Sequence, residues 1–275
     1  MRLTTLCENT AGTSGMVAEW GWSIFVQTDG MNILVDTGGG FAAVRNADKL
    51  GIDLKTTDKI LLSHSHADHT GGLREILGRT KHPEVIAHPA VWLPKLKKGN
   101  SEKSPVYNGI PFAREELEKF APLTFSERPV SFSENIMTTG EIPRTTDFET
   151  IESHFLVKKD GALKQDDFPD DLALICKTEK GLVIVLGCAH RGIINTIQHA
   201  RQLTGEQTVH TVLGGTHLYT KSDIQIDQTI RALKTMGVQN IGVSHCTGLR
   251  AAMRLAEAFG DHFFFNNAGN VRTIE

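Results

Sequence analysis

Four potential metal ligands lie within six consecutive residues of this chain. The segment SHSHADH at residues 63–69 carries His64, His66, Asp68 and His69. Imidazole and carboxylate groups suit zinc, iron or manganese, and the segment has no thiolate to build a closed structural site. If the turn holds His64 and His66 on one side, Asp68 and His69 face a neighbouring position. The segment therefore predicts two adjacent ions, which can share a hydroxide that is nucleophilic at neutral pH.

The elements around this segment place it directly after a strand. Lys59–Ser63 is apolar enough to form a buried strand that ends at His64, and the apolar spacing of residues 73–77 predicts a helix after it. Upstream, Ser23–Gln27 and Asn32–Asp36 have the pattern of an antiparallel hairpin. The ligand segment is therefore expected at the edge of a sheet.

Strands and helices alternate in the second half of the chain. Apolar runs predict strands at Ile151–Lys158, Leu172–Thr178, Leu182–Leu186, Thr208–Leu213, Asn240–Ser244 and His262–Asn266. Helical faces precede each of the last three, so the fold class is α/β or mixed. The histidine-bearing loops follow strand ends, where such sheets tend to place their sites.

Composition limits the classes of protein that the chain can belong to. The 275 residues carry a net charge of −3, which lacks the basic excess of a nucleic-acid binder. No apolar run approaches the roughly 18 residues of a membrane span, and the first eight residues show neither the apolar stretch nor the cleavage site expected of a signal peptide. The four cysteines form no CxxC pair and no disulfide framework. We expect a cytoplasmic protein that binds neither nucleic acid nor membrane.

We expect one domain over residues 1–275, with an irregular insertion or lid at about 94–150. This stretch holds six of the nine prolines, and loops of such length are often functional. Its lysines could attract an anionic substrate or could form a solvated surface. They are Lys95, Lys97, Lys98 and Lys103.

The pattern His-x-His-x-Asp-His after a buried strand resembles that of the metallo-β-lactamase superfamily, and the resemblance covers essentially the whole chain. It includes the hairpin that ends in Asp36 and the late strand that precedes His245 in GVSHCTG. The resemblance implies an α+β or α/β fold, a four-layer αββα sandwich of two mixed β-sheets with helices outside.

The middle of the chain departs from the general pattern of that superfamily. Cys188 stands where a bridging aspartate is expected, and no histidine precedes Leu172. The resemblance then implies that His190 supplies the missing imidazole. Either Cys188 or Asp171 is left as the substitute for the aspartate.

Three segments are similar to one branch of the superfamily. This branch includes the dihydropterin-ribofuranosylaminobenzene-phosphate synthase of archaeal methanopterin biosynthesis, and its bacterial members are mostly described as metal-dependent hydrolases. The segments are Pro169–Leu174, Gly187–Asn195 and Leu213–Leu218.

The resemblance also implies a role for each candidate residue. One ion would be held by His64, His66 and His190, and the other by Asp68, His69 and His245. Zinc is the commonest occupant of such sites, and iron and manganese accept the same ligands.

Three residues could have roles other than binding a metal directly. Asp68 could also accept a proton, and His217 could donate a hydrogen bond to substrate, act as a general acid or be an ordinary loop histidine. Asp36 would orient a ligating imidazole or simply cap a turn.

We therefore expect a binuclear metal-dependent hydrolase that uses metal-bound hydroxide on a small anionic or phosphorylated substrate. One alternative is a synthase that joins a pterin-methyl pyrophosphate to a ribofuranosylaminobenzene phosphate through a C–C bond. Another is a binding module that has lost activity. Diiron redox enzymes, nucleases and glyoxalase-type thioesterases fit less well, because this chain lacks a residue or a domain that each of these classes is expected to have. The substrate's identity is left open, and so is a homo-oligomer.

Overall fold

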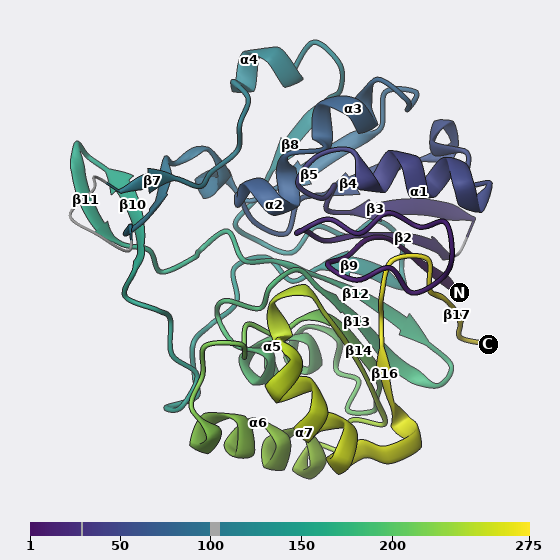
Figure 1. Cartoon of the computed structure of the whole chain (residues 1–275), viewed down its shortest axis with the longest axis vertical. Helices are drawn as coiled ribbons and strands as arrows, with labels where there is room; N and C mark the ends of the chain where they lie inside the picture. The colour runs from purple at the N-terminus through teal and green to yellow at the C-terminus, as the bar shows by residue number, and fades with distance from the viewer. Residues whose placement is uncertain (29, 100–104) are drawn as a thin grey trace.

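Two mixed β-sheets pack face to face between two layers of helices (Figure 1). The computed structural model describes residues 1–28, 30–99 and 105–275. This arrangement is the four-layer αββα sandwich that the sequence resemblance predicted. None of the helices in the described part of the chain has the length and apolar character needed to cross a membrane.

Strands from the first half of the chain, together with the C-terminal strand β17, build a seven-stranded sheet in the order β17-β1-β2-β3-β4-β5-β8. Pairing is antiparallel from β17 to β3 and parallel from β3 to β8. The C-terminal strand β17 pairs with β1, so both chain ends lie at the same edge (Figure 1). The strands are β1 (Arg2–Cys7), β2 (Ser23–Thr28), β3 (Met31–Val35), β4 (Lys59–Leu61), β5 (Glu84–Ala87), β8 (Leu123–Phe125) and β17 (Val271–Thr273).

The second half builds a six-stranded sheet in the order β16-β15-β14-β13-β12-β9. Pairing is parallel from β16 to β13 and antiparallel from β13 to β9. The strands are β9 (Ile136–Thr138), β12 (Ala173–Thr178), β13 (Gly181–Leu186), β14 (Val209–Gly215), β15 (Asn240–Ser244) and β16 (Phe263–Phe265).

Helices cover the outer face of each large sheet. On the outer face of the seven-stranded sheet, α1 (Ala42–Leu50) and α3 (Leu73–Leu77) pack against one apolar cluster. On the six-stranded sheet, α5 (Ile193–Thr204), α6 (Asp223–Thr235) and α7 (Leu249–Phe259) pack against another. Two further single-turn helices are α2 (Ala67–Thr70) and α4 (Arg114–Leu117).

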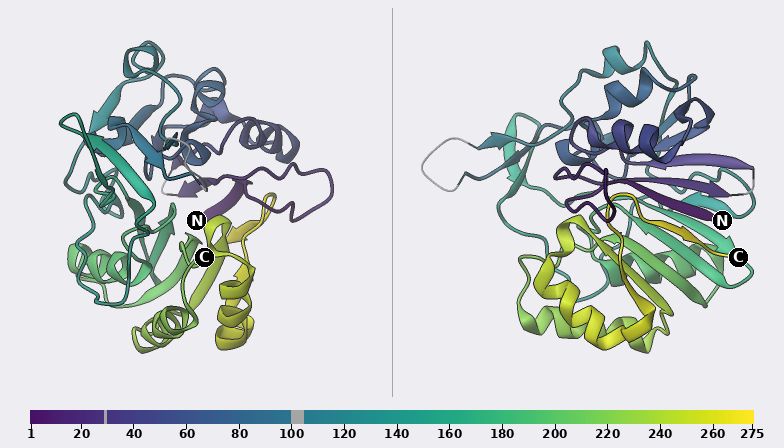
Figure 2. Two further views of the ribbon diagram at one scale, coloured as in Figure 1. Left: turned by 60° about the vertical axis from the view of Figure 1, so that its left-hand side comes forward. Right: turned by 45° about the vertical axis from the view of Figure 1, so that its right-hand side comes forward.

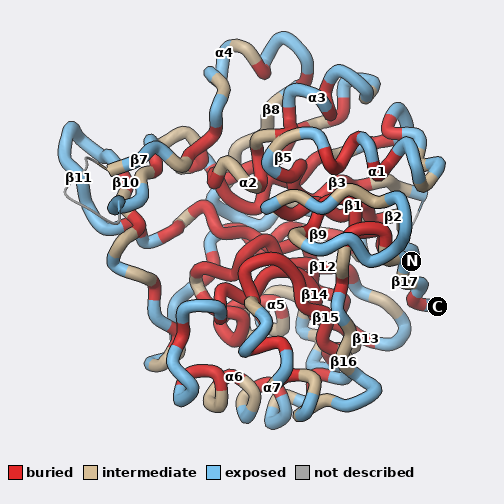
Figure 3. The backbone as a smooth tube through the Cα atoms, viewed as in Figure 1, coloured by how far each residue is buried: buried red, intermediate tan, exposed pale blue. Residues whose placement is uncertain are grey.

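Strand alternation explains why four layers form. In β13, Val183 and Val185 belong to the cluster between the sheets, whereas Ile184 and Leu186 face the helices. In β2, Ile24 faces the other sheet, whereas Phe25 belongs to the cluster that packs against α1. Both faces of these strands are buried, which accounts for their continuous apolar runs. Buried residues accordingly concentrate in the strands between the helix layers (Figure 3).

A third, four-stranded sheet lies at one side of the sandwich, in the order β11-β10-β6-β7 (Figure 2). It is antiparallel throughout. Its strands are β6 (Lys95–Lys97), β7 (Val106–Tyr107), β10 (Phe155–Lys159) and β11 (Ala162–Gln165).

The stretch 94–150 is more regular than the sequence indicated. It supplies β6 and β7 to the small sheet, and β8 and β9 extend the two large ones. These strands have only two or three residues each, too few to show an alternating pattern. The strand predicted at Ile151–Lys158 begins only at Phe155, and the residues before it form a loop.

Candidate metal centre

The candidate metal ligands meet where β4, β13 and β15 end. The chain turns sharply there, because several non-glycine residues adopt left-handed backbone angles. Asp36 follows β3 with φ of 56°, Ala189 follows β13 with 51°, and His217 and His245 follow β14 and β15 with 49° each. Such conformations are costly and cluster at functional sites, where the surroundings hold them. The sheet edge therefore directs side chains from distant segments to one place.

Asp36 orients two histidines of the ligand segment. One carboxylate oxygen accepts the Ser63 backbone N–H at 2.7 Å, and the other accepts the Ser63 hydroxyl and His69 Nδ1, each at 2.6 Å. The Ser63 hydroxyl in turn lies 2.9 Å from Nδ1 of His64. Both imidazoles thus use Nδ1 for support, which leaves Nε2 of each as a metal donor. Burial alone would lower the pKa of His69, but Asp36 beside it raises that pKa above its ordinary value.

The first donor set joins His64, His66 and His190, whose donor atoms all lie within 4.8 Å of one another. Nε2 of His64 is 3.1 Å from Nδ1 of His66. Both ring nitrogens of buried His190 lack a hydrogen-bond partner, and Phe168 stacks on this ring with centroids 3.8 Å apart. Burial lowers the pKa of His66 to about 3 and holds the pKa values of His64 and His190 well below the usual value. The three imidazoles are therefore neutral, which is the form that binds a metal.

The second donor set joins Asp68, His69 and His245 within the same distance of one another. Nε2 of His245 lies 3.2 Å from Oδ2 of Asp68, while its Nδ1 is held by Oδ1 of Asn9 at 2.9 Å. The other oxygen of Asp68 is buried without a partner. Burial would raise the pKa of Asp68, but the hydrogen bond from His245 and the nearby histidines hold it below the usual range.

Cys188 lies between the two sets, and Asp171 does not. Cys188 forms a further donor group with His64 and His69, and its Sγ is 3.1 Å from Nε2 of His69 and 3.3 Å from Sγ of Cys246. Among the described residues, no such group contains Asp171, whose Oδ2 instead accepts the Arg191 backbone N–H at 2.8 Å. Of the two substitutes left open by the sequence, the geometry favours Cys188.

The residues fit divalent metal ions. Two neutral nitrogens of His190 and one oxygen of Asp68 are buried without partners, and such groups are costly unless something binds them. The donors are mainly imidazole, with carboxylate and thiol nearby, a set that suits zinc or iron. The structure thus brings together all six predicted ligands in the two predicted sets, and their ligation stays a prediction.

A cavity of about 90 Å³ opens above these donors, and residues from several elements line it. His217 stands on its wall, with Nδ1 3.0 Å from Oε1 of Glu152. Lys221 lies 2.8 Å from the same oxygen, and Thr220 also donates to it. Burial would raise the pKa of Glu152, but the hydrogen bond and charge of His217, with Lys221, keep it below its usual value. Glu152 therefore fixes the ring of His217, a role that no spacing in the sequence indicated.

The predicted lysines of the insertion have different environments. Lys97 lines the cavity above the donors, whereas Lys98 is exposed and does not line it. Lys95 is buried and its Nζ lies 2.7 Å from Asp166 and 2.8 Å from Asp170. Neither alternative left open by the sequence holds for Lys95, because it is buried and already pairs with two carboxylates instead of facing substrate or solvent. Lys103 lies outside the described residues.

The ion pair of Lys95 also supports the ligand segment. Asp170 accepts the backbone N–H and the hydroxyl of Ser65, at 3.0 and 2.8 Å. Ser65 lies between His64 and His66 in the chain. The small sheet is thereby connected, through Lys95 and Asp170, to the backbone that carries two ligands.

Comparison with known proteins defines the class of protein. Residues 21–185 match the model of the metallo-beta-lactamase superfamily. Together with the αββα fold and the two donor sets, this match shows that the chain belongs to that superfamily.

Individual relatives are similar over nearly the full length. The chain is 32% identical to the 7,8-dihydropterin-6-methyl-4-(beta-D-ribofuranosyl)-aminobenzene-5'-phosphate synthase of Methanocaldococcus jannaschii, covering 98% of this chain and 96% of the synthase. It is 31% identical to an uncharacterised protein of the same organism, over 97% of each chain. The crystal structure of Tm1679, described as a metal-dependent hydrolase of the beta-lactamase superfamily, superposes with a TM-score of 0.85. That match has 28% identity and covers 100% of this chain and 99% of the other.

Proposed function

We propose that this chain is a binuclear metal-dependent hydrolase of a small phosphorylated or otherwise anionic molecule. The observation that carries the proposal is the meeting of two histidine-rich donor sets at Cys188, below a cavity that Lys97 lines. Two ions bound there, zinc being the commonest, would supply a nucleophilic water near neutral pH and stabilise developing negative charge.

The protein's own residues then bind the substrate and move its protons. Lys97 attracts the anionic group from the small-sheet side of the cavity. His217, held by Glu152 at 3.0 Å, presents its other ring nitrogen as a hydrogen-bond donor or general acid for the leaving group. Asp68 holds a ligand position and has a free oxygen that can accept a proton.

A synthase reaction is the second candidate, and the full-length similarity to the named synthase favours it. In that reaction a pyrophosphate group would leave from a pterin-methyl carbon. Either a ring carbon of the ribofuranosylaminobenzene phosphate would form a C–C bond and lose its proton, or the amine nitrogen would form a C–N bond and lose one of its protons. The same donor sets would bind the leaving pyrophosphate. The products distinguish the two functions: hydrolysis needs one substrate, whereas synthesis releases pyrophosphate only when both substrates are present.

The test is to load the protein with zinc, iron or manganese and follow products by phosphorus NMR. Phosphomonoesters, phosphodiesters and the two pterin-pathway substrates are supplied separately and together. Release of phosphate or pyrophosphate from a single substrate supports hydrolysis. Release of pyrophosphate only when both pterin-pathway substrates are present supports synthesis. If the metal-loaded protein turned over none of these substrates, both proposed functions would be contradicted.

Lys97→Ala tests the role of the cavity lysine. We expect its KM for an anionic substrate to rise by roughly tenfold with kcat little changed, because one charge that binds the substrate is removed. Lys98→Ala is the matched control, since Lys98 is adjacent and exposed but does not line the cavity. Equal kinetics in the two variants would contradict the assignment.

A further inference from the structure

A second, larger pocket continues from the metal centre. Its volume is about 360 Å³, and Trp20, Tyr219 and His245 line both this pocket and the small cavity above the donors. The loop between β1 and β2, the end of β15 and the start of α7 form its walls. A molecule whose anionic group lies at the metal centre can therefore extend into this pocket on the His245 side.

Exposed aromatic side chains gather around this pocket. Trp20 is 59% exposed, yet its indole N–H donates to Asp68 Oδ2 at 3.0 Å and its ring contacts that of His245 edge-on at 5.1 Å. Tyr219 contacts the ring of His217 edge-on at 5.4 Å. Phe265 and Leu249, both exposed, complete the apolar part of the wall. Large exposed apolar side chains that converge on one concavity are typical of a ligand site.

The wall also carries a buried carboxylate. Glu8 is 4% exposed, and its two oxygens accept the backbone N–H groups of His245 and Thr10, each at 2.7 Å. Each carboxylate oxygen has more than one acceptor site, so Glu8 can also accept an N–H from a ligand. A purely alkyl ligand would leave this capacity unused and would desolvate the carboxylate without replacing its hydrogen bonds.

We propose that this pocket binds a planar, nitrogen-containing ring of the substrate, which lies against Trp20 and Tyr219 and donates an N–H to Glu8. The proposal rests on the proposed function, because it assigns the organic part of the molecule whose anionic part lies at the metal centre. Flat aromatic walls favour flat rings, since stacking contributes binding free energy beyond that gained by burying apolar surface. The acidic group on the wall selects rings that carry N–H donors over hydrocarbon rings.

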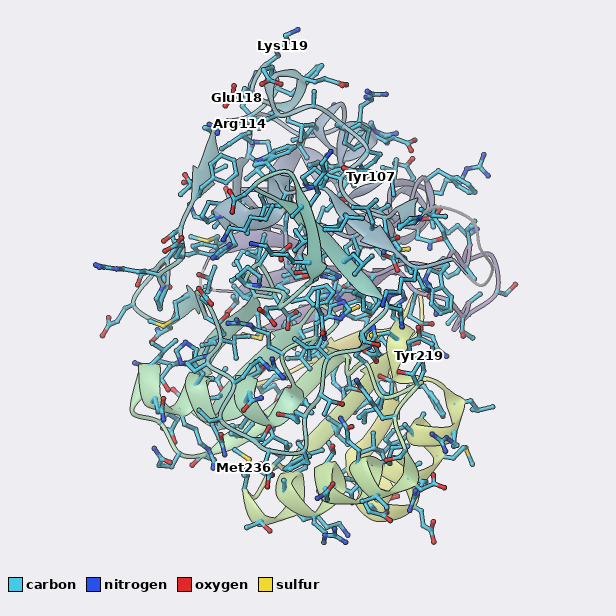
Figure 4. The ribbon with its side chains drawn as sticks, turned by 90° about the vertical axis from the view of Figure 1, so that its left-hand side faces the viewer. Tyr107, Arg114, Glu118, Lys119, Tyr219 and Met236 are labelled. Carbon is cyan, nitrogen blue, oxygen red and sulfur yellow. The ribbon has the colours of Figure 1, made fainter. Side chains whose placement is uncertain are left out.

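Binding of pterin, a planar ring system with N–H donors, tests the proposal. Titration of metal-loaded protein is followed by pterin and tryptophan fluorescence. We expect saturable binding that Tyr219→Ala weakens by roughly tenfold, in line with the loss of one stacking contact. Tyr107→Ala is the matched control, because Tyr107 is also an exposed tyrosine and lies well away from Tyr219 (Figure 4). Phe265→Ala replaces Tyr219→Ala if circular dichroism shows that the latter is unfolded.

Three results would overturn the proposal. They are absence of saturable pterin binding, equal weakening in the Tyr219 and Tyr107 variants, and displacement of pterin by octan-1-ol at equal concentration. Metal content and phosphoester turnover are measured on the same preparations. Turnover without pterin binding would overturn this proposal alone, whereas pterin binding without turnover would leave the pocket assignment in place and overturn the proposed function.

Discussion

At the scale of single residues, Asp36 determines how the ligand segment presents its nitrogens. It lies at the end of β3, is fully buried, and reaches His69 directly and His64 through Ser63. Each contact occupies Nδ1 and leaves Nε2 directed at the centre. A carboxylate behind a ligating histidine fixes both the tautomer and the orientation of the ring. We therefore propose that Asp36 positions the ligating imidazoles.

Asp36→Asn tests that role with almost no change in shape. We expect metal affinity to fall by roughly tenfold to a hundredfold, because an amide orients the imidazoles less well than a carboxylate does. A chelator competition titration measures the affinity. Asp160→Asn, on an exposed turn, is the control and is expected to bind metal like the wild type. An unchanged affinity in Asp36→Asn would show that the hydrogen bonds do not position the ligands.

The raised pKa of Asp171 predicts that the stability of the metal-free protein depends on pH. Burial raises the pKa of its carboxyl from 3.8 to about 7. Between these values the folded state keeps a proton that the unfolded state releases, so the free energy of unfolding falls as pH rises from about 4 to 7. The slope contributed is up to about 1.4 kcal/mol per pH unit.

Asp171→Asn removes this titration, while its side-chain oxygen can still accept the Arg191 N–H. Urea unfolding of the metal-free proteins at several pH values should show the variant gaining stability over the wild type towards pH 7. A constant difference between the two proteins from pH 4 to 7 would contradict the shifted pKa.

At the scale of elements, close packing joins the loop after β13 to the ligand segment. A Cβ added at Gly187 would lie 2.0 Å from Oγ of Ser63, so only glycine lets the two loops approach so closely. On the other side of the segment, Lys95 of β6 joins the small sheet to Ser65 through Asp170. The ligand segment is thus held from both sides by elements that are distant in the sequence.

Lys95→Met should destabilise the fold by about 3–5 kcal/mol, because it leaves the carboxylates of Asp166 and Asp170 buried without their cation. Equilibrium urea denaturation measures the loss. Lys159→Met, on the exposed end of β10, serves as the control and should change stability by about 0.5 kcal/mol or less. A loss below about 1 kcal/mol in Lys95→Met would mean that the buried ion pair does not stabilise this region.

At the scale of the whole molecule, much of the fold could be predicted because its signals are local. The ligand segment after a buried strand, the hairpin ending at Asp36 and the alternating C-terminal elements all lie where their apolar patterns indicated. Of the four-stranded sheet only β10 could be predicted, since β6, β7 and β11 have two to four residues each and the strands come from segments up to about 65 residues apart.

The candidate site likewise combines residues that could be predicted from the sequence with residues that could not. His64, His66, Asp68 and His69 are recognisable from spacing alone, whereas Glu152 and the ion pair of Lys95 depend on contacts between distant segments. The preference for Cys188 over Asp171 is also a matter of geometry. Both residues are buried, and only the distances to His64 and His69 separate them.

The number of metal ions bound per chain is the decisive measurement for the proposed binuclear centre. Protein purified without added metal is analysed by elemental mass spectrometry, beside His66→Ala and the surface control His262→Ala. We expect close to two ions per chain in the wild type and in His262→Ala, and clearly fewer in His66→Ala. Absence of metal from the wild type, with none taken up on addition of zinc, iron or manganese, would contradict this expectation.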